Sequence, residues 1–174
     1  SPDLLLLDEP SVGVDPLSRR DLWKIIEQLI DQEQLSVIVS TAYMDEAERC
    51  GHVFVFDRGR LLAEGTPDEL RERARGLTYE VKPPEGIPAR VLQARLIDAP
   101  DRIVDAVPRG GRVWLIRRPD TQEAALSELL PATEAKARSE ELEDAFMLLL
   151  RERERKEEGS ADPSDSSDLE PQAN

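Results

Sequence analysis

The feature that most constrains this chain is an apolar run that ends in two acids, LLLLDEP at residues 4–10. Four consecutive leucines predict a strand that is buried on both faces, as strands of a parallel sheet are. Asp8 and Glu9 then stand at the carboxyl end of that strand, where open α/β sheets bind their ligands. Carboxylates at such an edge are typical ligands of a hydrated magnesium ion beside a nucleotide. A buried strand that merely ends in two solvated acids is the alternative interpretation.

The residues after the acid pair predict a turn, a helix and a second strand. Proline and glycine end the first strand, and Asp15-Pro16 is typical of a helix cap followed by proline in the first turn. Apolar residues then recur every three or four positions, which predicts a helix over 16–33. The β-branched run SVIVS at 36–40 predicts a second buried strand.

The longer run LLLLDEPSVGVDPLSRRDLW resembles the Walker B strand and the D-loop of ABC-transporter ATPases. An apolar strand with two acids is common, but a solvated strand end does not explain the SVGVDP continuation. That continuation also argues against another family of P-loop ATPases. The resemblance implies that Asp8 holds Mg²⁺ through water and that Glu9 polarises the water that attacks ATP. It also implies that Asp15 belongs to a D-loop that faces a second ATPase domain.

The segment STAYMDEAERC at 40–50 resembles the H-loop of the same family, in which a histidine precedes the aromatic residue and reaches the terminal phosphate. This chain has Ala42 at that position. A methyl group neither donates a hydrogen bond nor carries a proton, so we expect a weakened or silent site. His52 lies beyond a predicted helix at 43–50 and is interpreted as an ordinary, partly exposed histidine. Cys50 is interpreted as a small packed residue.

The sequence contains no G-x-x-x-x-G-K-[ST] phosphate loop and no LSGGQ-like signature. Because the family needs both, the chain resembles the C-terminal part of a longer ATP-binding protein, from Walker B onward, and we expect it to be inactive by itself. The resemblance to the ATPase core continues to residue 76. It includes a predicted hairpin at 52–64 that turns at Arg58-Gly59, and a capped helix from Pro67 to about residue 75.

Beyond residue 76 short strands and helices alternate in the order β-α-β-β-α-β, which predicts a small ferredoxin-like α+β accessory domain over 77–156. The run SEELEDAFMLLL near its end is similar to the last helix of the accessory domain in antibiotic-exporter ATPases. Residues 157–174 contain six acids and no base, which predicts a disordered acidic tail. Within the accessory domain we expect strands at 78–82, 103–107, 112–117 and 132–139, and helices at 89–97, 122–130 and 140–156.

The predicted fold class is therefore α/β. Residues 1–76 are expected to be the C-terminal part of a P-loop NTPase parallel sheet with flanking helices, followed by the ferredoxin-like accessory domain. A net charge of −14 argues against a nucleic-acid surface or an anionic-membrane surface. A single cysteine excludes an internal disulfide, and the sequence has no apolar run of about 18 residues.

The resemblance implies a cytoplasmic chain that reaches the membrane only through a membrane-spanning permease subunit. It also implies a second ATPase domain as the partner in a head-to-tail dimer, either in another chain or in tandem in the same one. STAYMDEAE is similar to drug-exporter-like ATPases with tandem nucleotide-binding domains, one of which is often degenerate.

Two functions from different classes stay open. The first is the ATP-binding and hydrolysing component of an ABC-type exporter, with ATP and Mg²⁺ as its cofactors, which couples hydrolysis to transport. The second is a degenerate, non-catalytic nucleotide-binding domain that acts in dimerisation or regulation, as Ala42 would favour. No residue of the sequence identifies a transported molecule.

Overall fold

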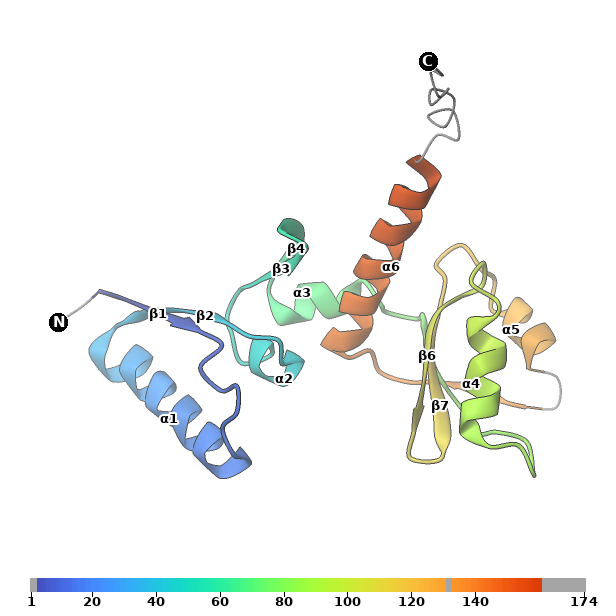
Figure 1. Ribbon diagram of the computed structural model, residues 1–174, viewed down its shortest axis with the longest axis horizontal. Coiled ribbons are helices and arrows are strands. Elements are labelled where there is room, and N and C mark those ends of the chain that lie inside the picture. The colour runs from blue at the N-terminus through green and yellow to red at the C-terminus, as the bar shows by residue number, and fades with distance from the viewer. Residues whose placement is uncertain (1–2, 131–132, 161–174) are drawn as a thin grey trace, which may run out of the picture. The chain divides into compact units, whose positions relative to one another are not determined.

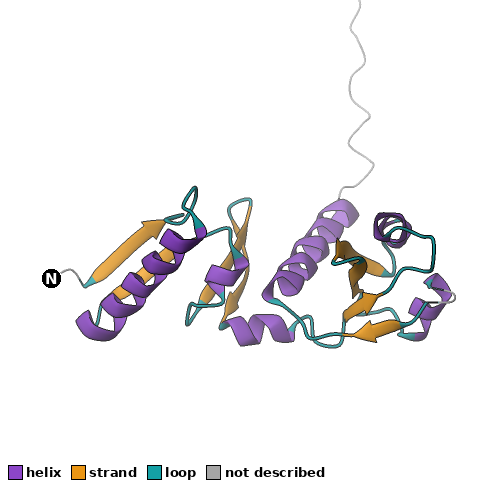
Figure 2. Ribbon diagram, turned by 90° about the horizontal axis from the view of Figure 1, so that it is seen from below, coloured by secondary structure: helices purple, strands orange, loops and turns teal. Residues whose placement is uncertain are grey.

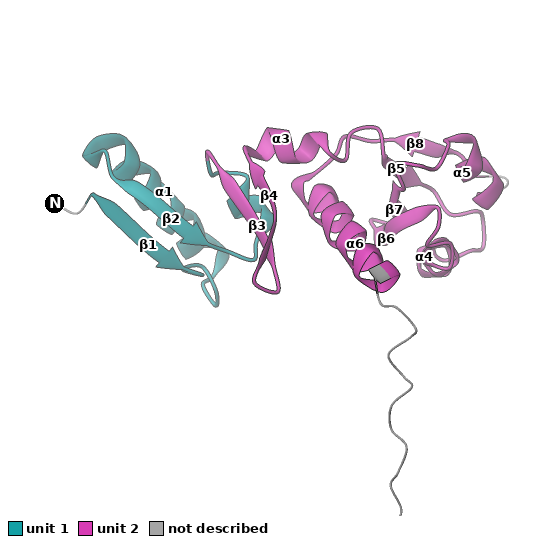
Figure 3. Ribbon diagram, turned by 90° about the horizontal axis from the view of Figure 1, so that it is seen from above, with its two compact units in different colours: residues 1–50 teal, residues 51–174 magenta. Residues whose placement is uncertain are grey.

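The computed structural model describes residues 3–130 and 133–160 and is a mixed α/β structure. The chain divides into two compact units, Ser1–Cys50 and Gly51–Asn174, which are described separately (Figure 1, Figure 3). This division lies before the hairpin that the sequence analysis assigned to the ATPase core. The predicted domain boundary at residue 76 stays a prediction.

Unit 1 consists of two parallel strands joined through a long helix. The strands pair in register from Leu4↔Ser36 to Asp8↔Ser40. The long helix and the second strand have the predicted bounds, whereas the short helix is four residues long instead of spanning 43–50. The elements are β1 (Leu4–Asp8), α1 (Pro16–Glu33), β2 (Ser36–Ser40) and α2 (Met44–Ala47).

Local chemistry explains why α1 begins and ends where it does. The Asp15 carboxylate accepts hydrogen bonds from the backbone N–H groups of Leu17 and Ser18 at 3.0 and 3.1 Å, and proline occupies the first turn. Gln34 ends the helix in the left-handed conformation. Trp23 and Ile26 are the buried residues of the helix. The predicted cap and helix are therefore confirmed.

The prediction that the first strand is buried on both faces is wrong for the described residues. Leu6 of β1 and Ile38 of β2 are 67% and 61% exposed. A parallel sheet is buried on both faces only when other elements cover both of them. The described residues of unit 1 form a two-stranded sheet and only one long helix, so one apolar face stays uncovered.

Unit 2 begins with a hairpin and a short helix. The strands β3 (Val53–Asp57) and β4 (Arg60–Gly65) are antiparallel, and the turn between them has positive φ angles of 47° at Arg58 and 75° at Gly59. The helix α3 (Pro67–Glu72) follows, with a capping box between Thr66 and Glu69. It ends earlier than the predicted residue 75 because the following backbone N–H groups bond three residues back, which tightens the chain into turns.

The rest of unit 2 is a four-stranded antiparallel sheet with helices on both faces (Figure 2). The strand order is β6-β7-β5-β8, and every neighbouring pair is antiparallel. The short β8 pairs only with β5, so it is an edge strand as predicted, and residue 132 of its predicted range lies outside the described residues. The elements are β5 (Thr78–Val81), α4 (Ala89–Ile97), β6 (Ile103–Arg109), β7 (Arg112–Arg117), α5 (Ala124–Leu129), β8 (Ala135–Ala137) and α6 (Leu142–Ser160).

Two apolar clusters lie on the opposite faces of this sheet. One contains Leu96 of α4 and Leu126 of α5, packed against strand residues such as Leu115. The other contains Leu148 of α6 and Ile116 of β7. Because Leu115 and Ile116 are consecutive strand residues, they point to opposite faces, so α4 and α5 cover one face and α6 covers the other.

The last helix, α6, is longer than the sequence predicted. Arg153 donates hydrogen bonds to the backbone carbonyl of Asp57, at 3.0 Å, and to the Asp57 carboxylate. Glu157 pairs with Arg153 at 3.0 Å and lies 3.5 Å from Arg60. These contacts extend the helix into the first four residues of the predicted tail. Residues 161–174, the rest of that tail, lie outside the described residues.

Among the described residues, no helix is both long and apolar enough to cross a bilayer. The leucine run forms part of a five-residue strand, Leu4–Asp8, rather than a helix.

Candidate functional site

The predicted acid pair lies at the carboxyl end of β1, next to the carboxyl end of β2. Asp8 is the last residue of β1, and its partner across the parallel pair is Ser40, the last residue of β2. Glu9 follows directly and leaves the strand. Both carboxyl-bearing residues are exposed, so their oxygens are open to a ligand.

Ser40 holds both acids in place. Its hydroxyl donates a hydrogen bond to Asp8 Oδ1 and accepts one from the backbone N–H of Glu9 at 2.9 Å. The same Glu9 N–H also lies 3.0 Å from the Ser40 carbonyl oxygen. Sequence reasoning assigned Ser40 no role. Equal five-residue strands that both end in a polar residue were the only signal that could have revealed it.

The backbone of Glu9 adopts an unusual conformation. Its φ angle is 42°, in the left-handed region that residues other than glycine seldom occupy. Such a conformation costs about 1–3 kcal/mol and persists only where the surroundings hold it. Two contacts stabilise this conformation. The Glu9 N–H bonds Ser40, and the Glu9 carbonyl accepts a hydrogen bond from the Val12 N–H at 3.1 Å. The Glu9 side chain therefore starts from a defined backbone position.

Asp15, the third predicted site residue, accepts hydrogen bonds from residues in the first turn of its own helix. Hydrogen bonds from the Ser18 side chain and backbone lower the pKa of the Asp15 carboxyl, because they stabilise its ionised form. This is the helix cap described above. A contact of Asp15 with a second ATPase domain stays a prediction.

Ala42, which the sequence analysis compared with the H-loop histidine, is exposed in the loop between β2 and α2. His52 belongs to unit 2, where its ring meets Phe54 edge-on with centroids 4.9 Å apart. Cys50 is half-buried, and burial raises the pKa of its thiol, as in a packed cysteine rather than a nucleophile. Neither residue is joined to the acid pair by any described contact.

Sequence reasoning also missed a buried carboxylate on α2. Glu46 is 1% exposed, and its two oxygens accept hydrogen bonds from Arg19 Nε and Thr41 Oγ1, each at 2.6 Å. Burial raises the pKa of Glu46, but the neighbouring polar groups of Ser11, Thr41, Trp23 and Arg19 outweigh that effect, so the pKa is lowered overall. Ser11 Oγ and Trp23 Nε1 are buried and have no hydrogen-bond partner among the described residues. A sequence shows no signal for such burial beyond helical spacing.

The oxygen donors at the strand end suit a magnesium ion. Within residues 3–130 and 133–160 no three or more histidine, cysteine or acidic side chains cluster as a self-sufficient metal site. A metal would therefore rely on one or two carboxylates together with water or ligand oxygens. Mg²⁺ is bound in that way beside nucleotides, usually through one or two carboxylates, so Asp8 and its neighbour Glu9 fit it.

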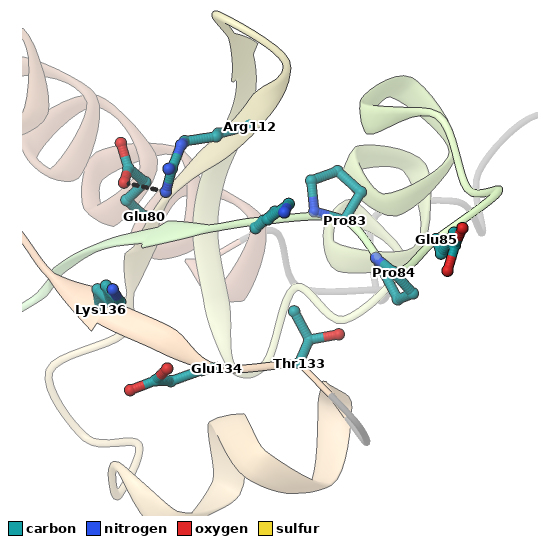
Figure 4. Close-up of a pocket in the computed structure, with 9 residues that line it drawn as sticks. Glu80, Pro83, Pro84, Glu85, Arg112, Thr133, Glu134 and Lys136 are labelled. Atoms are coloured by element: carbon teal, nitrogen blue, oxygen red, sulfur yellow. Dashed lines mark hydrogen bonds and ion pairs between the residues drawn. The ribbon is translucent and has the colours of Figure 1, made fainter.

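A pocket in unit 2 is a weaker candidate. It has a volume of about 600 Å³ and lies beside β5 and β8 (Figure 4). The Arg112 guanidinium points toward Glu80 and bonds it at 2.7 Å (Figure 4). Its charged side chains are three acids and three bases, so their charges cancel. The pocket therefore has no net charge that would select an anionic or a cationic ligand. The lining residues are Glu80, Lys82, Pro83, Pro84, Glu85, Arg112, Thr133, Glu134 and Lys136.

Comparison with known proteins finds several relatives that share sequence with this chain. No family model matches the chain. It is 34% identical over 151 residues to the probable multidrug ABC transporter ATP-binding protein YbhF of Escherichia coli, covering 86% of this chain and 26% of that protein. It is 39% identical over 103 residues to the daunorubicin/doxorubicin resistance ATP-binding protein DrrA of Streptomyces peucetius, covering 59% and 27%.

A third relative is the Nod factor export ATP-binding protein I of Cupriavidus metallidurans, 44% identical over 70 residues, covering 40% of this chain and 23% of that protein. The chain thus spans about a quarter of the length of the curated relatives that it matches, since the covered shares are 26%, 27% and 23%.

Proposed function

The chain belongs to the ATP-binding proteins of ABC transporters, and we propose that it is part of the ATP-binding and hydrolysing component of an exporter. That component would couple ATP hydrolysis to transport across a membrane. The observation that carries the proposal is the exposed acid pair at the carboxyl end of β1, held by Ser40. The names of the relatives, which refer to multidrug transport, drug resistance and Nod factor export, favour export.

In the proposed mechanism the two acids have different tasks. Asp8 would hold Mg²⁺ through water, and the bound ion would neutralise charge on the β- and γ-phosphates of ATP. Glu9 would orient the attacking water and accept its proton as general base. The strained backbone of Glu9 and its bonds to Ser40 support this role, because a base must be held in one place to act on one water.

The proposal assigns the phosphate cradle to sequence outside this chain. A P-loop and an LSGGQ-like signature are absent from the 174 residues, and the relatives are about four times as long as their matched part. By itself the chain would bind ATP poorly and hydrolyse none. Within the parent protein, β1 and β2 would belong to a P-loop-type parallel sheet with flanking helices.

We further propose that residues 77–156 form a ferredoxin-like accessory domain. The β-α-β-β-α-β order, the strand order β6-β7-β5-β8, and α4 and α5 on one face of the sheet support this assignment. The remaining partners would be a second ATPase domain, which the loop containing Asp15 faces in a head-to-tail dimer, and a membrane-spanning permease. That permease would hold the chain at the cytoplasmic side of the membrane.

A second candidate function is supported by one observation. The exposed Ala42 offers only a methyl group where the family has a histidine that reaches the phosphate. A degenerate domain that serves dimerisation or regulation would carry such a change.

The two functions are separated by Glu9→Gln in the full-length parent protein. If Glu9 is the base, ATP turnover falls by about a hundredfold or more while nucleotide-dependent dimers persist. Glu33→Gln, an exposed residue at the end of α1, is the matched control and should leave turnover unchanged. Equal ATP turnover in the Glu9 variant and the wild type would show that Glu9 is not the catalytic base. The second function would be supported if the wild-type parent protein has no ATP turnover and Ala42→His restores it.

A further inference from the structure

Glu46 is the most buried charged side chain among the described residues of this chain. An ionised carboxylate out of water costs several kcal/mol unless hydrogen bonds and an opposite charge compensate it. Its helix, α2, has only four residues and a cap without a side-chain hydrogen bond. So short a helix does not by itself account for a buried charge, and the partners of Glu46 show what the charge connects.

Those partners come from three separate segments of unit 1. Arg19 of α1 and Thr41 of the loop after β2 donate hydrogen bonds to Glu46. Trp23 of α1 and Ser11 of the turn that follows Glu9 contribute to its electrostatic environment, and their buried polar atoms have no hydrogen-bond partner among the described residues. The turn and the loop are the two segments that leave the strand ends where the acid pair stands. The Glu46 carboxylate therefore lies close to the two segments that follow β1 and β2.

Each of the two segments is connected to the acid pair in one short step. Thr41 follows Ser40, whose hydroxyl bonds Asp8 and the Glu9 N–H. Thr41 Oγ1 also accepts a hydrogen bond from the Tyr43 N–H at 3.0 Å, so it fixes the whole loop. On the other side, Ser11 lies in the turn that the Val12 N–H closes by donating to the Glu9 carbonyl at 3.1 Å, and Ser11 is 2% exposed.

We propose that Glu46 is a positioning residue for the acid pair: its hydrogen bond with Thr41 holds the loop after β2, and its burial together with Ser11 supports the turn after Glu9, so that Glu9 and Ser40 stay in register. The inference rests on the proposed function, since it assigns Glu46 a part in the same reaction. Glu46 itself touches neither Asp8 nor Glu9 and acts through Ser11 and Thr41. A displacement of about 1 Å at a catalytic group can cost about a hundredfold in rate, which is why such bracing matters.

The neighbouring acid, Asp45, offers a matched control. It pairs with the same Arg19, through two bonds of 2.7 and 2.8 Å, but its side chain is 71% exposed. Exposed ion pairs contribute little to stability. None of its described contacts involves Ser11 or Thr41. A change at Asp45 therefore removes an ion-pair partner of Arg19 without loosening the turn or the loop.

The test compares Glu46→Gln with Asp45→Asn in the full-length parent protein, with two measurements. The first is kcat and KM for ATP: Glu46→Gln should lower kcat about tenfold or more and leave KM within about twofold, because the brace acts on the position of Glu9 rather than on nucleotide binding. The second is amide hydrogen exchange, which should rise over residues 9–14 in Glu46→Gln. Asp45→Asn should change neither.

Thr41→Val keeps the size of the side chain and is the milder variant if Glu46→Gln fails to fold. It should raise exchange over the same residues and lower kcat in the same direction. Unchanged exchange over 9–14 in a folded Glu46 or Thr41 variant would overturn the inference. So would an unchanged kcat in a protein in which Glu9→Gln abolishes turnover. If Glu9→Gln has no effect, the proposed function fails instead, and the exchange measurement alone decides whether Glu46 holds the turn.

Discussion

The ion pair between Arg138 and Asp144 in unit 2 yields a stability prediction whose size follows from its contacts. Arg138 Nη2 and Nη1 donate to the two Asp144 oxygens at 2.5 and 2.9 Å. The two side chains are only 12% and 9% exposed. Asp144 also accepts the backbone N–H of Glu141 at 2.7 Å, just before α6 begins, so it caps that helix as well.

Asp144→Ala removes all three hydrogen bonds and leaves the guanidinium half of the pair behind. Breaking a buried pair costs about 3–5 kcal/mol, and losing a cap costs about 1 kcal/mol. Arg138 keeps a bond to the Ser139 carbonyl at 3.0 Å and lies over the Trp114 ring at 4.2 Å, so part of its stabilisation survives. We expect the free energy of unfolding to fall by about 3 kcal/mol. Asp144→Asn keeps an acceptor for the cap and should cost about 2 kcal/mol.

The assay is urea unfolding of the 174-residue chain, followed by far-UV circular dichroism and by Trp114 fluorescence in a Trp23→Phe background. Glu141→Gln is the control, because its pair with Arg109 at 3.1 Å is exposed on both sides and should contribute under about 0.5 kcal/mol. A loss for Asp144→Ala no larger than the loss for Glu141→Gln would refute the argument that burial makes this pair important.

Three further changes test other parts of the structure. Thr66→Ala removes the capping box with Glu69, whose two backbone bonds are 2.8 and 3.2 Å, and should lower stability by about 1 kcal/mol in thermal unfolding; no loss would mean that the cap is not formed. The pKa of Glu46 is lowered from 4.5, so the stability it contributes is present above that pH and is lost as the pH falls below it. The difference in unfolding free energy between wild type and Glu46→Gln should therefore shrink on acidification below 4.5, and a difference that grows would contradict the assigned pKa direction. Arg153→Gln removes the bonds to Asp57 and should speed amide exchange in the β3–β4 hairpin about tenfold, as expected for a charge-assisted bond, while exchange in β7 stays as in the wild type.

Much of the local structure could be predicted from residue patterns. The helices at 16–33 and 89–97 and the strands at 36–40 and 112–117 have the predicted bounds. Apolar periodicity, proline and capping residues act over a few neighbouring positions, so a short stretch of sequence contains the whole signal. The placement of Asp8 and Glu9 at a strand end was predictable for the same reason.

Coverage of the sheet was not predictable. The leucine run indicates that β1 is apolar but not which elements lie against it, and Leu6 is exposed in the described residues. The end of α6 shows the same limitation. Its last turn contains acids that suggested a tail, yet the Glu157 carboxylate pairs with Arg153 and lies near Arg60, far away in the sequence.

The sequence by itself determined the family, the elements and the acid pair, because motifs and helix or strand preferences are written within short windows of residues. Only the tertiary structure decided that Ser40, 32 positions from Asp8, holds it, and that Glu46 is buried against Arg19 and Thr41. Those arrangements depend on strand register and on packing between α1 and α2. A residue type shows what a side chain is able to bind, but long-range packing sets which partner reaches it and how much water is excluded.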